Sequence, residues 1–369
     1  MSLKNASSAA EVAIEFEKSD PRNWQYFAQG AVNVMFRYTC ADRCALSRFL
    51  LRVPKLQSQH GSGAAEDSTT GEEQSLFRER FFSICGSQYM PSHIDVRISP
   101  AYLSWLPEVG CALSPCGFAS LVQDVSAMPG GLTVEIKPKC GTVPSRANLS
   151  DEHACKSRTC RFCMYQYTKL KKGKVTRTST YCPLKFFNGS YDVIATNLQS
   201  LFDCPQNNIK ISCADGILFG SDVTDQSMLT AALESLGLSV QGLAHFVAQS
   251  LLISNVLQHI KRVQELDSLG IELLWKRFCQ LHDSPEILTQ VDDFMLATCA
   301  KDVSVIIALE PSCSCSPDFI PLRESSWCYR VRIIDVDQRP RAWLQKYFKQ
   351  DLDIVSEFLA SGCTRVCVE

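Results

Sequence analysis

The residues best suited to chemistry are Glu135, Lys137 and Lys139, in the segment VEIKPKCG at residues 134–141. As a strand, this segment places the three side chains on one face, because side chains alternate along a strand. Two neighbouring ammonium groups repel each other and one carboxylate cannot neutralise both, so a dense anion would stabilise them. Pro138 has no N–H, which predicts that the strand lies at a sheet edge or ends there. Without an anion, the pattern is equally typical of a solvated, charged edge strand.

Positive charge is concentrated in the segment that follows. Residues 137–185 contain twelve lysines or arginines and two acids, Asp151 and Glu152, a net charge of +10. The whole chain has a formal charge of −2, so the remainder carries −12. A local cationic region on an otherwise acidic protein favours a small polyanionic ligand over a nucleic acid. The lysines at 171, 172 and 174 are typical of a solvated loop.

Length and composition place further bounds on the chain. It has 369 residues, 46% hydrophobic and 21% charged, enough for two or three lobes with cores of their own. The first twenty residues show no secretory signal, and no stretch approaches the ~20 apolar residues of a membrane span. Nineteen cysteines in such a chain predict reduced thiols in the cytosol or nucleus, with a few available for metal. We expect a monomer without a membrane or nucleic-acid partner.

The elements that must position these residues predict an α+β protein. Alternating or apolar runs predict strands within residues 24–38, 47–53, 303–309 and 327–333. Apolar residues at helical spacing predict helices over residues 76–85 and 243–260. The fourth strand runs into Asp335, at a strand end where ligands are commonly bound.

A polar insert and a chain break divide the sequence. Residues 57–74 (QSQHGSGAAEDSTTGEEQ) are acidic and rich in Gly and Ser, which predicts a mobile loop. The chain breaks at Pro129-Gly130-Gly131. We therefore predict one lobe over residues 1–124 and a second over residues 125–369.

Two features of the first lobe are candidates for phosphate binding. The segment around Gly30 is rich in small residues, which let backbone N–H groups approach a phosphate, although an ordinary strand turn looks the same. Arg52 lies on the next apolar strand, where it either reaches a phosphate or faces solvent.

Six segments, in order, resemble the inositol-pentakisphosphate 2-kinase family: EIKPKCG at 135–141, CRFCMYQYTK at 160–169, YCPL at 181–184, PQNN at 205–208, AKDVSVII at 300–307 and IDVDQRP at 334–340. The resemblance implies that ATP phosphorylates the 2-hydroxyl of inositol 1,3,4,5,6-pentakisphosphate, giving inositol hexakisphosphate and ADP. It implies a bilobal α+β fold distantly like protein kinases. In that fold a smaller N-lobe accompanies an enlarged C-lobe with the inositol-phosphate-binding insert.

The resemblance also assigns roles. It places the nucleotide against Gly30, Asn33, Arg52, Gln123, Asp124, Glu135 and Lys210. It places the inositol phosphate against Lys137, Lys139, Lys169, Asn207, Asn208, Arg339 and Tyr347. Phosphoryl transfer needs one carboxylate to accept the hydroxyl proton and another to hold magnesium. By resemblance these are Asp302 and Asp335, with Lys137 between donor and acceptor, although a lone Asp302 is equally typical of a cap.

Some residues depart from the family pattern. Ala28 and Ala31 stand where glycine is common, and Trp343 stands where some relatives carry an arginine, with Arg341 or Lys346 available to supply the charge. These departures leave two alternatives open. One is a catalytically inactive inositol-phosphate sensor or scaffold, and the other is a kinase for less phosphorylated inositols.

Cysteine spacing suggests a metal site. Cys160 and Cys163 form a C-x2-C pair, with Cys182 nineteen residues further on and either Cys155 or His153 as a fourth ligand. Four such ligands would close a tetrahedral structural zinc site in a cationic, loop-rich segment. Reduced cysteines that pack as small apolar residues are the alternative.

Overall fold

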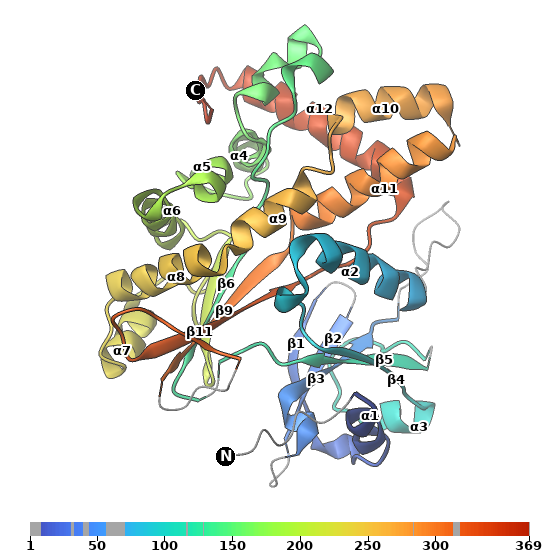
Figure 1. Ribbon diagram of the computed structural model, residues 1–369, viewed down its shortest axis with the longest axis vertical. Coiled ribbons are helices and arrows are strands. Elements are labelled where there is room, and N and C mark those ends of the chain that lie inside the picture. The colour runs from blue at the N-terminus through green and yellow to red at the C-terminus, as the bar shows by residue number, and fades with distance from the viewer. Residues whose placement is uncertain are drawn as a thin grey trace. The chain divides into compact units, whose positions relative to one another are not determined.

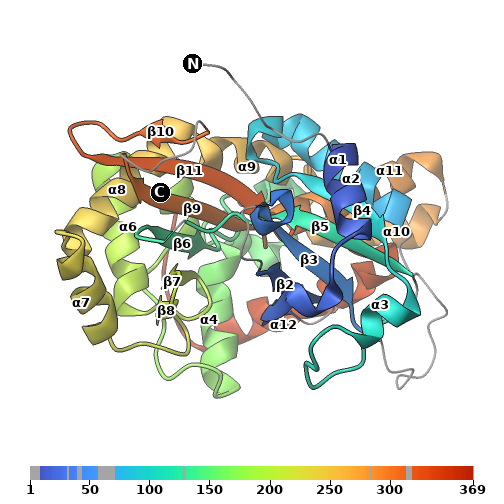
Figure 2. The ribbon, with the colours of Figure 1, turned by 90° about the horizontal axis from the view of Figure 1, so that it is seen from below.

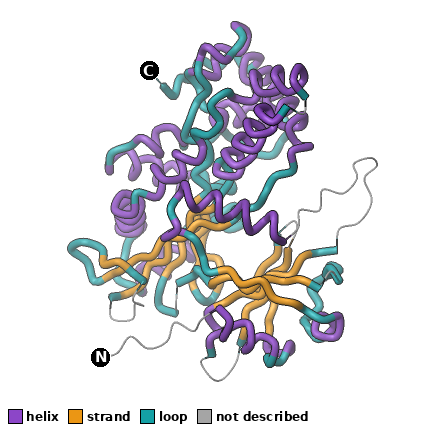
Figure 3. Tube along the Cα trace, turned by 45° about the vertical axis from the view of Figure 1, so that its right-hand side comes forward, coloured by secondary structure: helices purple, strands orange, loops and turns teal. Residues whose placement is uncertain are grey.

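The computed structural model describes residues 9–30, 33–39, 44–56, 71–115, 117–127, 129–282, 284–312 and 318–368. The chain divides into two compact units, Met1–Gly71 with Pro91–Val125, and Glu72–Met90 with Ser126–Glu369. Each unit contains one antiparallel sheet with helices (Figure 3). The predicted α+β class is therefore confirmed.

The first unit is built on a five-stranded sheet in the order β1-β2-β3-β5-β4. Its strands are β1 (Trp24–Gln29), β2 (Asn33–Tyr38), β3 (Phe49–Pro54), β4 (His93–Arg97) and β5 (Phe118–Gln123). Its helical segments are α1 (Ala9–Glu17), η1 (Pro21–Asn23), η2 (Ala45–Arg48) and α3 (Pro100–Ser104). Val34 and Phe36 alternate with less buried neighbours and pack against Trp24 and Leu121, so period-two alternation produced the strand and its core.

The second unit contains a six-stranded sheet in the order β10-β11-β9-β6-β7-β8. Its strands are β6 (Leu132–Ile136), β7 (Ile209–Cys213), β8 (Gly216–Phe219), β9 (Ser304–Pro311), β10 (Ile320–Pro321) and β11 (Trp327–Ile334). Figure 2 shows β11, β9 and β6 next to one another. Ile136 pairs with Val305, and Ser304 pairs with Ile334. The last residues of β6 and β11 therefore lie beside the first residues of β9, and the residues of the candidate site are located there.

Most helices of this unit lie above the sheet in the view of Figure 1. The helices of the unit are α2 (Gly71–Cys85), α4 (Arg161–Lys171), α5 (Pro183–Asn188), α6 (Tyr191–Asp203), α7 (Ser227–Ser235), α8 (Val240–Ser254), α9 (Val256–Gln264), α10 (Gly270–Leu281), α11 (Pro285–Ala300) and α12 (Leu344–Ala360). Short 3-10 segments are η3 (Ser87–Tyr89), η4 (Arg146–Asn148), η5 (Asp151–Ser157) and η6 (Arg341–Trp343).

The single helix predicted over residues 243–260 is wrong. Asn255 has a φ of 56°, which ends α8 and separates it from α9. Asn is one of the few residues that tolerate this left-handed conformation. The apolar spacing continues across the break, so periodicity alone does not reveal it.

The predicted loop over residues 57–74 is corrected at its end. Residues 57–70 lie outside the described residues, and residues 71–74 already belong to α2. The Gln74 side chain donates to Val336 O at 2.8 Å and accepts from Gln338 N at 2.9 Å. These bonds attach the helix start to the segment that follows β11.

Two further expectations concern the membrane and the thiols. Within the described ranges no single helix is long and apolar enough to cross a membrane; α7 and α8 reach that length only as a pair bent by 79°. Most described cysteines are free, as predicted. Cys328 is disulfide-bonded and departs from that expectation.

Candidate active site and a four-cysteine cluster

The Lys-x-Lys segment is a loop rather than a strand. β6 ends at Ile136, so Lys137 and Lys139 follow the strand and do not share its face, which corrects the predicted alternation. The strand ends two residues before Pro138, which lacks the N–H that a ladder needs, whereas the alternative of an edge strand is wrong because β6 lies between β9 and β7. Lys139 has a φ of 65°, a left-handed conformation that is unusual for a lysine. Such strain occurs where the surrounding structure imposes it, commonly at functional sites.

The first of the two lysine–aspartate ion pairs of this loop joins Lys137 to Asp335. The Lys137 Nζ lies 2.7 Å from Asp335 Oδ2. Burial by itself lowers the pKa of Lys137, but the charges of Asp335, Glu135 and Asp302 outweigh it and raise that pKa. Asp335 directly follows β11 and has a φ of 64°, so its backbone is also left-handed. Lys137 therefore stays protonated beside a carboxylate at the strand end.

A hydroxyl connects this pair to Glu135. Ser304 Oγ lies 2.8 Å from Glu135 Oε1 and 2.9 Å from Asp335 Oδ2. One hydroxyl has one hydrogen, so it can donate to only one carboxylate at a time. Lys210 Nζ lies 2.6 Å from Glu135 Oε2, because the two residues face each other across β6 and β7. The result is a group of hard oxygen donors neutralised by two lysines.

The second lysine–aspartate ion pair of the loop joins Lys139 to Asp302. The Lys139 Nζ lies 2.8 Å from Asp302 Oδ1, and Arg339 Nη2 lies 3.5 Å from Asp302 Oδ2. Asp302 lies between α11 and β9, and its side chain is 53% exposed. An exposed carboxylate with two cationic neighbours is accessible to a ligand. A carboxylate that only capped a helix or strand would not need this exposure or these cations.

Lys169 contributes another positive charge. Its Nζ donates to Gln206 Oε1 at 2.9 Å from the last turns of α4. Burial lowers the pKa of Lys169, and the nearby charge of Lys139 lowers it further. Among the described residues, no carboxylate forms an ion pair with Lys169. Lys139 and Lys169 thus lie close enough to repel, as the clustered charge in the sequence suggested.

The asparagine pair divides into an exposed and a buried residue. Asn207 is exposed. Asn208 is only 1% exposed, and its Nδ2 donates to Lys137 O at 3.0 Å. The backbone N of Lys137 donates in turn to Asn208 O at 2.9 Å. Asn208 therefore holds the start of the Lys-x-Lys loop.

Tyr347 lies near the ion pair of Lys139 and Asp302. Burial raises its pKa, and the charges of Arg339 and Asp302 both act on it. The Trp343 ring lies one helical turn earlier and contacts Tyr347 edge-on, at 6.3 Å between centroids.

The two residues expected to compensate for Trp343 differ. Arg341 makes two bonds of 2.6 Å to Asp292, so its guanidinium is already held by a carboxylate. The Lys346 Nζ lies 4.2 Å from the Trp343 ring centroid, a cation–π distance. Lys346 is therefore the better placed of the two to supply the charge.

Arg161, the first residue of α4, was not among the residues expected from the sequence. Its Nη2 donates to Gln350 Oε1 at 2.9 Å, while its Nη1 is buried without a partner among the described residues. Its positive charge acts on Tyr347 and Lys301. Arg161 stands inside the CRFCMYQYTK segment, so that segment already contained the signal.

The residues of the first unit that were predicted to contact the nucleotide form two groups. With the Asn33 amide oriented towards Arg52, its oxygen accepts from Arg52 Nη2 at 2.8 Å and Nε at 3.1 Å. Gly30 N donates to Asn33 O at 2.9 Å, and open space surrounds the position a Cβ would take at Gly30. Gly30, Asn33 and Arg52 are therefore neighbours. Ala31 lies outside the described residues.

The other two residues, Gln123 and Asp124, lie at the end of β5. Asp124 Oδ2 accepts from Arg37 Nη2 at 2.9 Å. The Gln123 side chain accepts from Ser92 N at 3.2 Å. Both residues remain predictions as nucleotide contacts.

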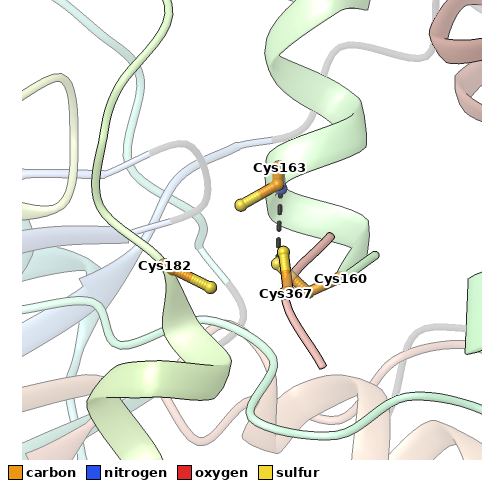
Figure 4. Close-up of side chains that lie close together, drawn as sticks. All are labelled: Cys160, Cys163, Cys182 and Cys367. Atoms are coloured by element: carbon orange, nitrogen blue, oxygen red, sulfur yellow. Dashed lines mark hydrogen bonds between the residues drawn. The ribbon is translucent and has the colours of Figure 1, made fainter. Parts of the chain in front are cut away.

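Four cysteines form a compact group: Cys160, Cys163, Cys182 and Cys367, with sulfur atoms all within 4.8 Å of one another (Figure 4). The first three are the residues predicted from spacing. The predicted fourth ligand is corrected, because the fourth sulfur belongs to Cys367 near the end of the chain. Hydrogen bonds from Cys160 and Cys163 lower the pKa of Cys367 to about 7, which favours its thiolate, the form that binds metal.

Neither of the expected fourth ligands belongs to this group. His153 Nδ1 is bound to Glu272 Oε2 at 2.8 Å. Cys155 packs in a small apolar cluster with Met164, Ile354 and Phe358. The chain end is held beside α4 by backbone bonds from Cys367 N and Val368 N to Arg158 O, at 2.8 and 3.1 Å.

Comparisons with known proteins agree with these residues. The model of the family described as inositol-pentakisphosphate 2-kinase matches residues 26–353. The inositol-pentakisphosphate 2-kinase of Oryza sativa subsp. indica is 26% identical over 95% of this chain and 96% of its own length. The enzymes of Danio rerio and Arabidopsis thaliana are 26% and 22% identical over 94% and 92% of the chain, and over 95% and 94% of their own lengths. The family predicted from six short segments is confirmed, and the chain belongs to the inositol-pentakisphosphate 2-kinase family.

Proposed function

We propose that this chain transfers the γ-phosphoryl group of ATP to the 2-hydroxyl of inositol 1,3,4,5,6-pentakisphosphate, giving inositol hexakisphosphate and ADP. Family membership supports the kinase reaction. The observation that carries the residue assignment is a short loop with two lysine–aspartate pairs, Lys137–Asp335 at 2.7 Å and Lys139–Asp302 at 2.8 Å. The two lysines of one loop therefore lie beside two carboxylates. The reaction needs one carboxylate to accept a proton and another to bind magnesium.

Asp302 acts as the general base in this proposal. Its exposed carboxylate accepts the proton of the attacking hydroxyl, while Lys139 and Arg339 hold it in place. Substrate phosphates would attract both cations, which frees a carboxylate oxygen for the hydroxyl. The proposal therefore gives Lys139 and Arg339 a double role, as anchors of Asp302 and as phosphate ligands.

Asp335 is the proposed magnesium ligand. Its carboxylate lies beside Ser304 and Glu135, and this set of hard oxygen atoms suits magnesium. Magnesium held by Asp335 would neutralise charge on the phosphoryl group transferred from ATP. Lys137 remains protonated and provides a positive charge between donor and acceptor.

The cations of the second unit bind the substrate phosphates. Lys139, Lys169 and Arg339 are partly exposed, and Lys169 has no described acid partner. Arg161 is a further candidate, because its buried Nη1 has no hydrogen-bond partner in the described chain. A polyanion would supply an acceptor for the Arg161 Nη1 and a negative charge for Lys169.

Each unit contains residues that we propose for nucleotide binding. In the first, Gly30, Asn33 and Arg52 surround a turn with open space at the glycine. We propose that Arg52 meets a phosphate there and that Gln123 and Asp124 meet the adenine. In the second unit, we propose that the ion pair of Glu135 and Lys210 contacts the nucleotide next to the magnesium ligand Asp335.

We also propose a bilobal arrangement distantly like protein kinases, with residues 1–124 as the smaller lobe and residues 125–369 as the larger. The five-stranded antiparallel sheet of the first unit supports the smaller lobe. The substrate-type cations all belong to the second unit, which supports an enlarged substrate-binding lobe.

Zinc is the proposed ligand of the four cysteines. A tetrahedral zinc with Zn–S bonds of about 2.3 Å separates its sulfurs by ~3.8 Å. The sulfurs of Cys160, Cys163, Cys182 and Cys367 lie within 4.8 Å of one another, so small side-chain movements close the tetrahedron. Such a site would fix the start of α4, the helix that presents Lys169.

The test is phosphoryl transfer by the purified protein. Magnesium–ATP and inositol 1,3,4,5,6-pentakisphosphate are supplied, and both ADP and inositol hexakisphosphate are quantified. We expect transfer by the unaltered protein and a loss of about 100-fold or more for Lys137→Ala and Asp302→Ala. Lys172→Ala, which alters an exposed lysine, is the control and should keep full activity.

Two outcomes would contradict the proposal. The first is no ADP release together with tight binding of inositol hexakisphosphate and no binding of ATP, which would identify an inactive sensor. The second is faster turnover of a less phosphorylated inositol, which would identify a different acceptor.

A further inference from the structure

A buried glutamine connects the loop that contains Lys139 with the helix end that precedes Asp302. Gln264 is the last residue of α9 and is 0% exposed. Its Oε1 accepts from Gly141 N at 2.7 Å. Its Nε2 donates to Lys139 O at 2.8 Å and to Ala300 O at 3.0 Å. Two carbonyls and one N–H surround the amide, so the identity of its partners determines its orientation.

These three bonds join the Lys-x-Lys loop to the end of α11. Ala300 is the last residue of that helix, where carbonyl groups lack partners within the helix. Asp302 follows two residues later, and its Oδ1 lies 2.8 Å from the Lys139 Nζ. Lys139 is therefore held at both ends, by Gln264 at its carbonyl and by Asp302 at its ammonium.

The loop needs such support because its backbone is unfavourable. Lys139 has a φ of 65°, which lysine rarely adopts. At Gly141 an added Cβ would lie 2.3 Å from the Phe187 ring, so the loop passes directly over that ring. The Tyr181 hydroxyl also donates to Pro138 O, at 2.9 Å. Gln264 is the described side chain that bonds both this loop and the segment leading to Asp302.

We propose that Gln264 is a positioning residue for phosphoryl transfer, which keeps Lys139 aligned with Asp302. This inference rests on the proposed roles of those two residues. Gln264 itself lies in the interior and contacts no reacting atom. Its effect is to determine where the carboxylate and the ammonium meet the attacking hydroxyl, for which displacements of 1 Å are costly.

Gln264→Met is the direct test, because methionine has a similar length and none of the three bonds. We expect kcat to fall roughly 10- to 100-fold. The KM for ATP should remain within about two-fold, since Gln264 bonds none of the proposed nucleotide ligands. Gln264→Glu keeps an acceptor for Gly141 N and loses both donors, so its kcat should fall as well.

Ile260→Ala is the matched control, because Ile260 lies one turn earlier on α9 and is also fully buried. It weakens the same helix and leaves the three hydrogen bonds of the Gln264 side chain in place. Its kcat, measured below its unfolding temperature, should remain within about two-fold of the unaltered protein. Hydrogen exchange adds a readout independent of activity: the Gly141 amide should be protected in the unaltered protein and exposed in Gln264→Met.

The outcomes are distinguishable. Absence of transfer by the unaltered protein would overturn the proposed function and this inference with it. Transfer by the unaltered protein with an unchanged kcat for Gln264→Met would overturn the positioning role alone, as would an equal loss for Ile260→Ala. Rapid exchange at Gly141 in the unaltered protein would also overturn it, and that measurement requires no variant to fold.

Discussion

Replacing Lys169 by methionine separates affinity from stability. Lys169 donates to Gln206 Oε1 at 2.9 Å and repels the nearby Lys139. A hydrogen bond to a charged group contributes about 1.5–3 kcal/mol, which is roughly 10- to 150-fold in affinity. We therefore expect Lys169→Met to bind inositol pentakisphosphate about 10- to 150-fold more weakly. The free energy of unfolding should stay the same or rise, because a partly buried, repelled cation is removed while an apolar stem remains.

The pH dependence follows from the lowered pKa of Lys169. The unfolded chain titrates at the ordinary value, so between the two pKa values it binds more protons than the folded chain. Stability contributed by Lys169 therefore rises with pH across that alkaline window. Affinity for the polyanion moves the opposite way and falls as pH rises through the lowered pKa. Both trends should disappear in Lys169→Met.

Calorimetric titration at constant ionic strength measures the affinity, and urea unfolding measures the stability. Lys171→Met is the control: it lies two residues further along α4, its side chain is 68% exposed and it pairs with Glu357 at 2.6 Å. We expect its affinity to match the unaltered protein. Unchanged affinity in Lys169→Met, or a loss of more than about 1 kcal/mol of stability, would refute the reasoning.

Three more predictions address the metal sites and the core. Asp335→Asn keeps a residue that tolerates a φ of 64° but removes the charge, so the magnesium needed for half-maximal rate should rise about 10-fold or more, as a magnesium titration of the rate would show. Lys156→Met leaves the buried Asp351 carboxylate, now 2.5 Å from Lys156 Nζ, without its closest partner. It should cost about 3–5 kcal/mol in urea unfolding, and adding Asp351→Leu should restore most of it. Elemental analysis should find about one zinc per chain, with much less in Cys182→Ser, and a chelator should lower the unfolding temperature of the unaltered protein only.

Local sequence carried much of the chemistry. Alternating apolar residues predicted the strand that became β11, and a continuous apolar run predicted the strand that became β9, because both are local patterns of burial. The concentration of lysines and arginines indicated a polyanionic ligand before any fold was known. Three cysteines of the four-sulfur group were also predicted from the sequence, because C-x2-C spacing allows two cysteines to bind the same metal ion.

Other features depend on contacts between distant segments. The break at Asn255 interrupts an apolar pattern that continues through it, so α8 and α9 read as one helix. The Lys-x-Lys segment has strand-like alternation but leaves the sheet at Ile136, where Asn208 takes over its backbone bonds. Such departures follow from hydrogen bonds and packing outside the local window.

The sequence by itself therefore determined the family, the α+β class and the residue types of the site. Only the tertiary structure decided which lysine meets which aspartate, that Gln264 holds them in register and that Cys367 completes the sulfur group. The reason is physical: residue type and periodicity act between neighbours along the chain. Ion pairs and buried hydrogen bonds form between whichever groups the folded backbone brings within a few ångströms.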